Sequence, residues 1–484
     1  MIFKNLEPFK VWSYFNEICK IPRLSKNEEQ IRRYLIDFAK KQRLEYRTDD
    51  AGNVLIIKPA HRGYENRKSV ILQSHMDMVG EKDADTGHDW AKDPIIPLLD
   101  GKWVKAKDTT LGADDGIGIA AQLAILEDRD LKAGPLECLF TVDEESGMTG
   151  AIKLGKDFFE SRILINLDSE DEGELFIGCA GGMDTVAELE YNKEKAKSDY
   201  ASIKLSITGL HGGHSGDEIH KGYANSVKIM TGLLQTLTKA YDIRIAEFNG
   251  GNLRNAIPRE AFALITCNKR NLDMIKKDTT AYGEKVKKEY ADNESQLSIS
   301  AGKTEDLAWI IDEKSQKSLL DALEKCPHGV IAWSEDMEGL VETSTNLASV
   351  KFVDGKIRIV TSQRSSVESA KKEIAGRINN IFSACGASAK HSGGYPGWKP
   401  DTRSEILNIT KSSYKKLFAT EPIVRAIHAG LECGLILEKY PGLDMISFGP
   451  TIKGAHTPQE RLDIETTKKF WDLLADVLKN IPAN

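Results

Sequence analysis

The chain has 484 residues, of which 40% are hydrophobic and 29% are charged, and its formal net charge is −7. This length exceeds one ordinary domain and predicts two, each large enough to bury a core of its own. The acidic balance, without a basic stripe interleaved with aromatic residues, argues against a nucleic-acid partner.

The cysteines and the N-terminal residues indicate the cellular compartment. The seven cysteines lie far apart, are odd in number and form no Cys-x-x-Cys pair, which is typical of buried thiols in a reducing compartment. Residues 1–20 have neither the apolar core nor the cleavage site of a signal peptide, and no apolar run approaches membrane-spanning length. We therefore expect a cytoplasmic protein without a membrane partner.

The first 185 residues alternate between helical and strand patterns. Apolar spacing predicts two helices within residues 6–44, and Ser25-Lys26-Asn27-Glu28 resembles a capping box at the start of the second. Strands are predicted at residues 54–57, 70–79, 136–142 and 163–167, and a loop turns into an apolar helix at residues 111–121. This alternation predicts an α/β domain with a parallel or mixed sheet and functional residues at the strand ends.

Two candidate site residues lie at the end of the strand over residues 70–79. His75 and Asp77 are two positions apart, so they point to the same side of a strand. A carboxylate there can accept the proton of one imidazole nitrogen and leave the other nitrogen free to bind a metal. The pair alone would also suit a hydrogen-bonded histidine with no metal. Only the motifs that follow favour metal binding.

Acidic residues recur at later turns and strand ends. Asp114 and Asp115 stand at a glycine-flanked turn before a helix, where an aspartate can also serve as a cap. The run Asp143-Glu144-Glu145 directly follows an apolar strand, and adjacent carboxylates raise each other's pKa unless cations neutralise them. Asp168 follows the strand at residues 163–167.

The pattern changes near residue 185 and returns near residue 396. Residues 186–395 combine half-exposed strands with amphipathic helices, which predicts an inserted α+β domain, with a construction from two similar halves as one option. Residues 1–185 and 396–484 are expected to form one discontinuous domain. Near its end, His456 stands in a small-residue loop before the last helix. Histidines with carboxylates suit Zn²⁺ or Mn²⁺ when no thiolate is available.

The order of these motifs resembles that of the M20 co-catalytic metallopeptidases over nearly the whole chain. Ser-His-Met-Asp-Met, Thr-Leu-Gly-Ala-Asp-Asp-Gly-Ile-Gly and Gly-Ala-His-Thr-Pro-Gln-Glu-Arg-Leu are similar in particular to the aminoacyl-histidine, or cytosol non-specific, dipeptidase branch. The resemblance implies a zinc-peptidase-like α/β catalytic domain, with a central mixed sheet flanked by helices, interrupted by an α+β lid domain.

The resemblance also implies a ligand set for two zinc ions, with Co²⁺ or Mn²⁺ as substitutes. Asp114 would bridge the ions. One ion would also bind His75 and Asp168, and the other would bind Glu145 and His456.

Further roles are carried over from the same family. Asp77 would orient His75, and Glu144 would be the general base. The peptide bond after the bridging aspartate, here between Asp114 and Asp115, tends to be cis in this family. Many relatives have a lysine where this chain has Gly116, which favours the dipeptidase branch over the deacylases.

Three lid residues match substrate-binding positions of relatives. His214 lies in the glycine- and histidine-rich run over residues 209–216 and matches a histidine that helps to stabilise the oxyanion. Asn255 matches a polar lid residue, and Arg364 stands where relatives bind the free carboxylate of the substrate. An incidental histidine in a flexible turn, and a solvated arginine after a strand, are the alternatives at these positions.

Together these assignments predict a metal-dependent dipeptidase that hydrolyses unblocked dipeptides, including Xaa-His dipeptides such as carnosine. The alternatives are a tripeptide aminopeptidase or an N-acyl amino acid deacylase of the same family, or a peptide-binding relative without activity. The intact ligand set and Glu144 argue against the last alternative. Dimeric relatives bring a lid histidine from the partner subunit, whereas a doubled lid could supply it internally; we expect a homodimer.

Overall fold

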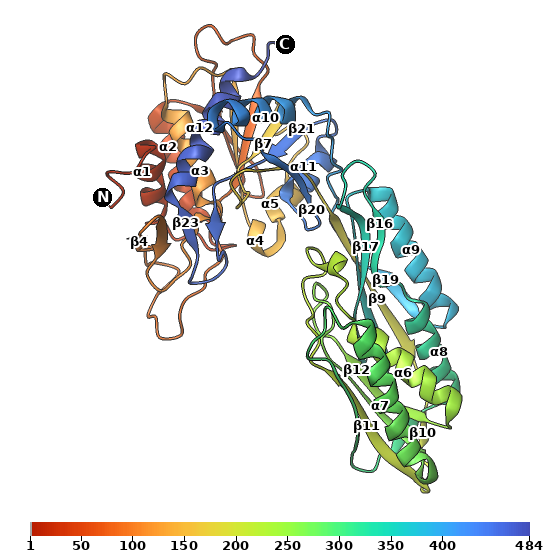
Figure 1. Cartoon of the computed structure of the whole chain (residues 1–484). Coiled ribbons are helices and arrows are strands. Elements are labelled where there is room, and N and C mark those ends of the chain that lie inside the picture. Colours follow the sequence, from red (N-terminus) through yellow and green to blue (C-terminus); the bar gives the residue numbers. More distant parts are fainter. Residues whose placement is uncertain (1) are drawn as a thin grey trace. The chain divides into compact units, whose positions relative to one another are not determined.

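The computed structural model describes residues 2–484, which divide into two compact units (Figure 1). Unit 1 comprises the chain up to Cys179 together with Trp398–Ala426 and Leu431–Asn484. Unit 2 comprises Ala180–Gly397 and Ile427–Gly430. Within residues 2–484, none of the helices combines the length and the apolar character that crossing a bilayer requires.

The main sheet of unit 1 has eight strands in the order β1-β2-β6-β3-β7-β21-β8-β20. β3 runs parallel to β6 and β7, and β7 runs parallel to β21, while the β1–β2, β2–β6 and β21–β8 pairs are antiparallel. The sheet is therefore mixed, as predicted. Its strands are β1 (Glu45–Thr48), β2 (Val54–Lys58), β3 (Val70–His75), β6 (Leu136–Thr141), β7 (Ile163–Asn166), β8 (Glu174–Cys179), β20 (Ile423–Ile427) and β21 (Asp444–Ser447).

Helices of unit 1 pack on this sheet and on one another. α3 lies against β3 and α1 lies against α3, while α10 contacts both β21 and α12. Almost every residue of α3 is buried, because its sequence is apolar on all sides. The helices are α1 (Phe9–Ile18), α2 (Glu29–Gln42), α3 (Ala113–Glu127), α4 (Glu144–Gly147), α5 (Thr149–Lys153), α10 (Glu405–Phe418), α11 (Glu432–Lys439) and α12 (Ile464–Asn480).

A smaller sheet of unit 1 carries the chain into its last helix. Its order is β22-β23-β5-β4, with β4 (Pro97–Asp100), β5 (Trp103–Ala106), β22 (Ile452–Lys453) and β23 (Arg461–Asp463). β22 and β23 are antiparallel, so residues 454–460 form the connecting loop of a hairpin. His456 therefore lies at a hairpin loop rather than in an irregular linker.

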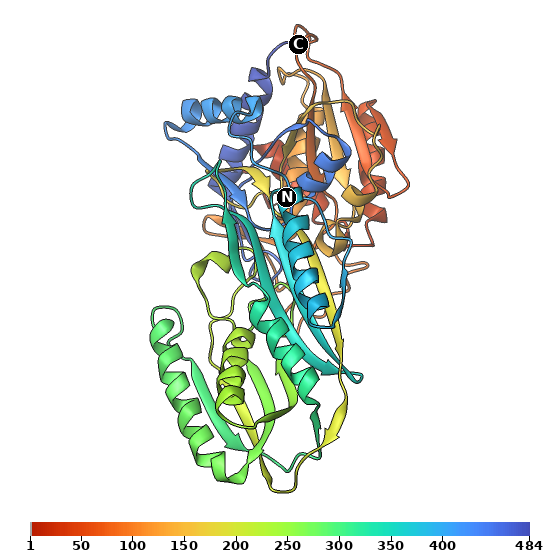
Figure 2. The same cartoon turned by 90° about the vertical axis from the view of Figure 1, so that its right-hand side faces the viewer.

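Unit 2 is built on a separate nine-stranded sheet, in the order β14-β11-β13-β12-β17-β18-β9-β19, with β16 paired to β17. The contacts of α6, α7, α8 and α9 place these helices over the strands, where they bury an apolar core (Figure 2). A short pair, β10-β15, lies apart from this sheet.

The elements of unit 2 are β9 (Gly181–Glu190), β10 (Lys193–Lys195), β11 (Tyr200–Thr208), η1 (Ile219–Lys221), α6 (Ser226–Ala240), β12 (Arg244–Gly250), β13 (Ala261–Asn268), η2 (Lys269–Asn271), α7 (Leu272–Glu289), β14 (Ser298–Lys303), β15 (Trp309–Ile311), α8 (Glu313–Lys325), β16 (Gly329–Trp333), β17 (Val341–Val353), β18 (Lys356–Ser365), α9 (Glu368–Ala384) and β19 (Ser388–His391).

One local prediction is wrong. The capping box at Ser25 does not form, because α2 begins only at Glu29 and the Ser25 hydroxyl instead donates to Asp77 at 2.8 Å. Arg364 lies inside β18 with its side chain buried, so the alternative of a solvated arginine after a strand does not hold. At Ser25 a tertiary contact replaces the local contact that the sequence pattern predicts.

Candidate metal centre and active site

Three parallel strands of unit 1 bring the acidic and histidine motifs to one edge of the sheet. His75 ends β3 and pairs in register with Thr141, the last residue of β6. The run Asp143-Glu144-Glu145 begins two residues after β6, and Asp168 comes two residues after β7. Since parallel strands end at a common edge, residues far apart in the sequence meet there.

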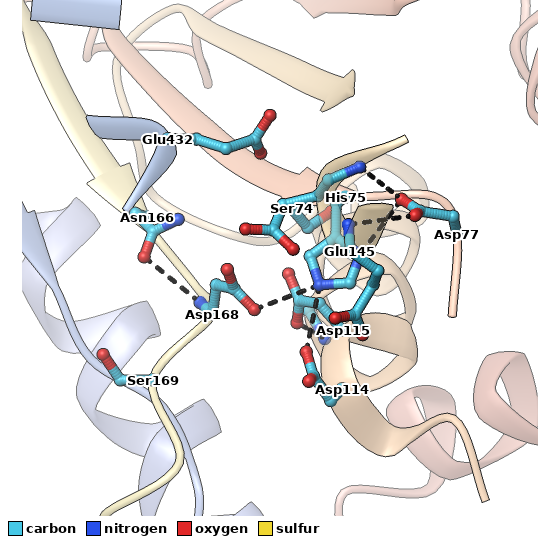
Figure 3. A network of polar contacts seen from close by, with 12 residues as sticks. Ser74, His75, Asp77, Asp114, Asp115, Glu145, Asn166, Asp168, Ser169 and Glu432 are labelled. Atoms are coloured by element: carbon cyan, nitrogen blue, oxygen red, sulfur yellow. Dashed lines mark hydrogen bonds and ion pairs between the residues drawn. The ribbon is translucent and has the colours of Figure 1, made fainter. Parts of the chain in front are cut away.

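His75 lies among three carboxylates. Its Nε2 is 3.0 Å from Oδ1 of Asp114 and 3.3 Å from Oδ1 of Asp168 (Figure 3). Its Nδ1 is 3.4 Å from Oδ1 of Asp77, a charge contact at the long end of hydrogen-bonding distance. Burial alone would lower the pKa of His75, but the surrounding carboxylates raise it well above its ordinary value.

Asp114 joins this group to a second one. Its Oδ1 faces His75, while its Oδ2 is 3.1 Å from Nε2 of His456. The same His456 nitrogen is 2.9 Å from Oε2 of Glu145. Hydrogen bonding to Asp114 and Glu145 raises the pKa of His456 to about 11. Two histidine–carboxylate groups therefore share one aspartate.

The backbone around Asp114 has the expected geometry. The peptide bond between Asp114 and Asp115 is cis, which confirms the feature implied by the family resemblance. The Asp115 carboxylate turns into α3 and accepts the N–H of Gly118 at 3.0 Å. A Cβ on Gly116 would stand 2.7 Å from Nη2 of the buried Arg23, so a side chain there would displace this guanidinium.

Asp77 and the acidic run after β6 form a second layer behind the histidine. Asp77 is fully buried, and its carboxylate accepts the backbone N–H groups of Glu144 at 3.0 Å and Glu145 at 3.2 Å. Burial would raise the pKa of Asp77, but His75, the N–H of Glu144 and the Ser25 hydroxyl lower it to about 2. Asp143 accepts hydrogen bonds from the hydroxyls of Ser146 and Thr149, and these bonds stabilise the turn after β6.

The crowding of carboxylates fits a pair of cations. Burial and the charge of Asp114 raise the pKa of Asp168 to about 7, and burial together with Asp168 raises that of Glu144. Four carboxylates, Asp114, Glu144, Glu145 and Asp168, face two imidazoles, and two divalent ions would balance their charge.

The arrangement of single atoms also fits metal binding. Ligand atoms of His75, Asp114 and Glu145 lie within 4.8 Å of one another. Oε1 of Glu145 is buried and has no hydrogen-bond partner among residues 2–484. Imidazole nitrogen and carboxylate oxygen are the donors that Zn²⁺ accepts in sites without cysteine.

Sequence reasoning missed three buried charged residues beside these groups. Arg23 donates to the carbonyl oxygens of Met76, Asp77 and Gly112. Glu432 accepts from Gln73 and Thr141, each at 2.7 Å, and burial raises its pKa to about 7. The third, Glu460, binds the loop before Asp114. Only Glu460 carried a signal, because it belongs to the motif that contains His456.

The predicted lid residues lie together within unit 2. A Cβ on Gly216 would stand 3.0 Å from Cε1 of His214 and 3.2 Å from Nη1 of Arg364, so both side chains converge on this glycine. Asn255 adjoins them, since its carbonyl accepts the N–H of Ser215 at 2.8 Å. A further histidine, His428, was not predicted; its Nε2 is 2.8 Å from the Ser344 hydroxyl, and burial lowers its pKa to about 3.

Arg364 has the features of an anion-binding residue. Its side chain is buried, and Nη1 lies 3.4 Å from both the Tyr395 hydroxyl and the His428 carbonyl oxygen. Nε is buried without a partner among the described residues. A buried guanidinium with unused donors suits a carboxylate ligand.

Comparisons with known proteins place the chain in a family. Residues 71–480 match the peptidase family M20/M25/M40, and the chain belongs to this family. The chain is 43% identical over 478 residues to a cytosol non-specific dipeptidase of Escherichia coli K12, covering 99% of both sequences.

Solved structures agree with this assignment. The aminoacylhistidine dipeptidase of Vibrio alginolyticus is 41% identical, with a TM-score of 0.96 over 100% of this chain and 98% of that one. The aminopeptidase PepT of Bacillus cereus, at 15% identity and a TM-score of 0.58 over 98% of this chain and 99% of that one, shares the fold.

Proposed function

We propose that this protein is a metal-dependent dipeptidase that hydrolyses unblocked dipeptides, including Xaa-His dipeptides such as carnosine. The observation that carries the proposal is the position of Asp114, whose two oxygens face two separate histidine–carboxylate groups. The names of the Escherichia coli and Vibrio relatives, a cytosol non-specific dipeptidase and an aminoacylhistidine dipeptidase, support the substrate class.

We assign two Zn²⁺ ions to the site, with Co²⁺ or Mn²⁺ as substitutes. His75, Asp114 and Asp168 would hold one ion, and Asp114, Glu145 and His456 would hold the other. Once bound, such ions supply Lewis-acid polarisation of the scissile carbonyl and of the attacking water.

The protein's own residues would orient groups and move the proton. Asp77 fixes the orientation of His75 and, through two backbone N–H groups, the turn that carries Glu144. Glu144 would take the proton of the attacking water and return it to the leaving amine, which is typically worth ~10²–10⁴-fold in rate.

We further propose that unit 2 recognises the substrate. Arg364 would bind the free carboxylate of the dipeptide, and His214 would donate a hydrogen bond to the developing oxyanion. Nδ1 of His214 lies 3.1 Å from Oδ2 of Asp217, and this contact would orient the imidazole. Asn255 would add a polar contact from the same loop cluster.

The cellular setting is also proposed. None of the seven cysteines, all within the described residues, forms a disulfide, and six are buried, which suits the reducing cytoplasm. The name of the Escherichia coli relative points the same way. The homodimer expected from the resemblance is tested by analytical ultracentrifugation, where one species of twice the chain mass is the expected result.

The test of function is hydrolysis of a small substrate panel by the purified protein. The panel contains β-Ala-His, Gly-His, Leu-Gly, a tripeptide and an N-acetylated amino acid, and Glu144→Ala serves as the inactive control. Each substrate is assayed before chelation, after chelation and after restoring Zn²⁺, Mn²⁺ or Co²⁺.

We expect metal-restored cleavage of the free dipeptides alone. Cleavage of the tripeptide instead would assign a tripeptide aminopeptidase, and cleavage of the acetylated substrate alone would assign a deacylase. No turnover with any metal would leave a peptide-binding relative.

A further inference from the structure

Glu460 is a buried carboxylate that no step of the proposed mechanism uses. It is the last residue of the β22–β23 hairpin loop, and its side chain is 2% exposed. Oε2 accepts the N–H groups of Leu111 at 2.8 Å and Gly112 at 2.9 Å. Oε1 accepts those of Ala113 at 2.7 Å and Asp114 at 3.3 Å. Four successive backbone donors therefore end on one side chain.

These four donors have no local partner that could replace Glu460. They belong to the loop that opens α3, whose N-cap residue is Gly112, with φ of 67° and no side-chain cap. The first N–H groups of a helix lack partners within the helix and favour negative charge. Glu460 thus supplies, from a distant part of the chain, the acceptor that the loop itself does not contain.

The hairpin loop that carries Glu460 also carries His456. Within the loop, the N–H of Glu460 donates to the carbonyl of Thr457 at 3.0 Å, and the Thr457 hydroxyl donates to the carbonyl of Gly454 at 2.7 Å. His456 has φ of 62° in this turn. The loop is therefore internally bonded, and fixing Glu460 also fixes His456 relative to the loop before Asp114.

A buried cation completes the arrangement on the other side of the same loop. Arg23 is 3% exposed, and it donates to the carbonyl of Gly112 and to those of Met76 at 3.0 Å and Asp77 at 2.6 Å. Arg23 thus ties the Asp114 loop to the end of β3, while Glu460 ties it to the hairpin loop. The two buried charges are of opposite sign.

We propose that Glu460 is a positioning residue of the metal centre, which holds His456 at the distance from Asp114 that allows both to bind one ion. The proposal rests on the proposed function, because it presupposes that these residues bind metal. It predicts that the ion shared by Asp114, Glu145 and His456 depends on Glu460 more than the ion held by His75 and Asp168.

Isosteric substitution separates positioning from mere helix capping. In Glu460→Gln the amide oxygen can serve only one pair of N–H groups, while the amide NH₂ faces the other pair as donor against donor. Glu460→Asp keeps the charge but lacks a methylene and can reach one pair. The matched control is Glu137→Gln: Glu137 is a buried carboxylate of β6 that accepts N–H groups of Glu160 and Ser161, at the strand end away from His75.

The experiment is titration of chelated wild-type and variant proteins with Co²⁺, followed by competition with a chelator and by the visible spectrum, which reports the ligand geometry. We expect Glu460→Gln to lose ~10–100-fold in affinity for one of two ions, as is usual when a residue behind the ligands is removed. Glu460→Asp should lose less, and Glu137→Gln should bind both ions with the wild-type spectrum even where its thermal stability falls.

Two results would overturn the proposal. One is Glu460→Gln binding two Co²⁺ ions with wild-type affinity and spectrum; the other is Glu137→Gln losing as much affinity as Glu460→Gln. Should Glu460→Gln fail to fold, unchanged binding by Glu460→Asp overturns it equally. A wild-type protein that binds fewer than two ions would instead refute the metal centre itself, so the two failures can be told apart.

Discussion

Oδ1 of Asp77 accepts the backbone N–H of Glu144 at 3.0 Å and at the same time lies 3.4 Å from Nδ1 of His75. One carboxylate oxygen therefore contacts both a proposed metal ligand and the turn that carries the proposed general base. An uncharged replacement at this position should disturb both.

Replacing Asp77 by Asn tests this link. The amide has one acceptor oxygen for the His75 and Glu144 contacts and places NH₂ against the N–H of Glu145. We expect metal affinity to fall by ~10–100-fold, measured by chelator competition. Asp444→Asn is the control, because Asp444 also accepts a backbone N–H, that of Ile406, at the start of β21. Equal metal affinity in both variants would contradict the link.

Glu144 and Glu145 are adjacent, but substitutions at the two positions should have different effects on catalysis and on metal binding. Glu144→Gln removes the proposed base and should lower kcat by ~10²–10⁴-fold while two ions remain bound. Glu145→Gln removes a proposed ligand and should lower the metal content. Metal analysis and kinetics on both variants decide the matter, and loss of an ion in Glu144→Gln would speak against its role as base.

The role of Arg364 can be tested through the substrate carboxylate that it is proposed to bind. Loss of a hydrogen bond to a charged group costs ~1.5–3 kcal/mol, so Arg364→Met should lose about 10–100-fold in kcat/KM on free dipeptides. Arg364→Lys should recover part of this loss, because it keeps the charge without the two-pronged geometry. A dipeptide amide is the control substrate, and an equal loss on the amide would exclude carboxylate recognition.

The stability of unit 2 should fall in mild acid because of His328. Burial lowers the pKa of His328 to about 4, and its Nδ1 lies 3.3 Å from Nδ2 of Asn225 and accepts the N–H of Leu347 at 3.4 Å. The unfolded chain, with an ordinary pKa near 6.5, therefore binds more protons between about pH 6.5 and 4. Stability is full above this window and declines through it, by on the order of 3 kcal/mol.

Urea unfolding at several pH values measures this effect. His328→Gln removes the titrating group and should flatten the decline between pH 6.5 and 4. It should not remove the decline entirely, because His428 is also buried with a lowered pKa. Parallel pH profiles for the wild type and His328→Gln would show that His328 makes no contribution.

Strand ends explain why so much of the centre is predictable from sequence. His75 ends an apolar strand and Glu145 and Asp168 come after two others, and parallel strands must bring such positions to one edge. The mixed sheet could be predicted for the same reason, since apolar runs alternate with helical patterns. Local pattern and tertiary position agree at these residues.

Other features depend on contacts that no local pattern contains. Glu460 meets residues more than 340 positions earlier in the chain, and the motif that it shares with His456 does not show which residues it contacts. Arg23 was missed for the same reason. Ser25 was assigned to a helix cap, because the sequence does not reveal that Asp77 lies closer to its hydroxyl than the helix does.

The insertion of unit 2 has a consequence for synthesis of the chain. The strands β3, β6 and β7 leave the ribosome early, but β21, the parallel neighbour of β7, follows only after residues 180–397. At about 5–20 residues per second, that insertion takes on the order of 10–40 s. Throughout this time the apolar edge of β7 lacks its partner strand, so chains stalled before Asp444 should be protease-sensitive in unit 1 and should engage chaperones.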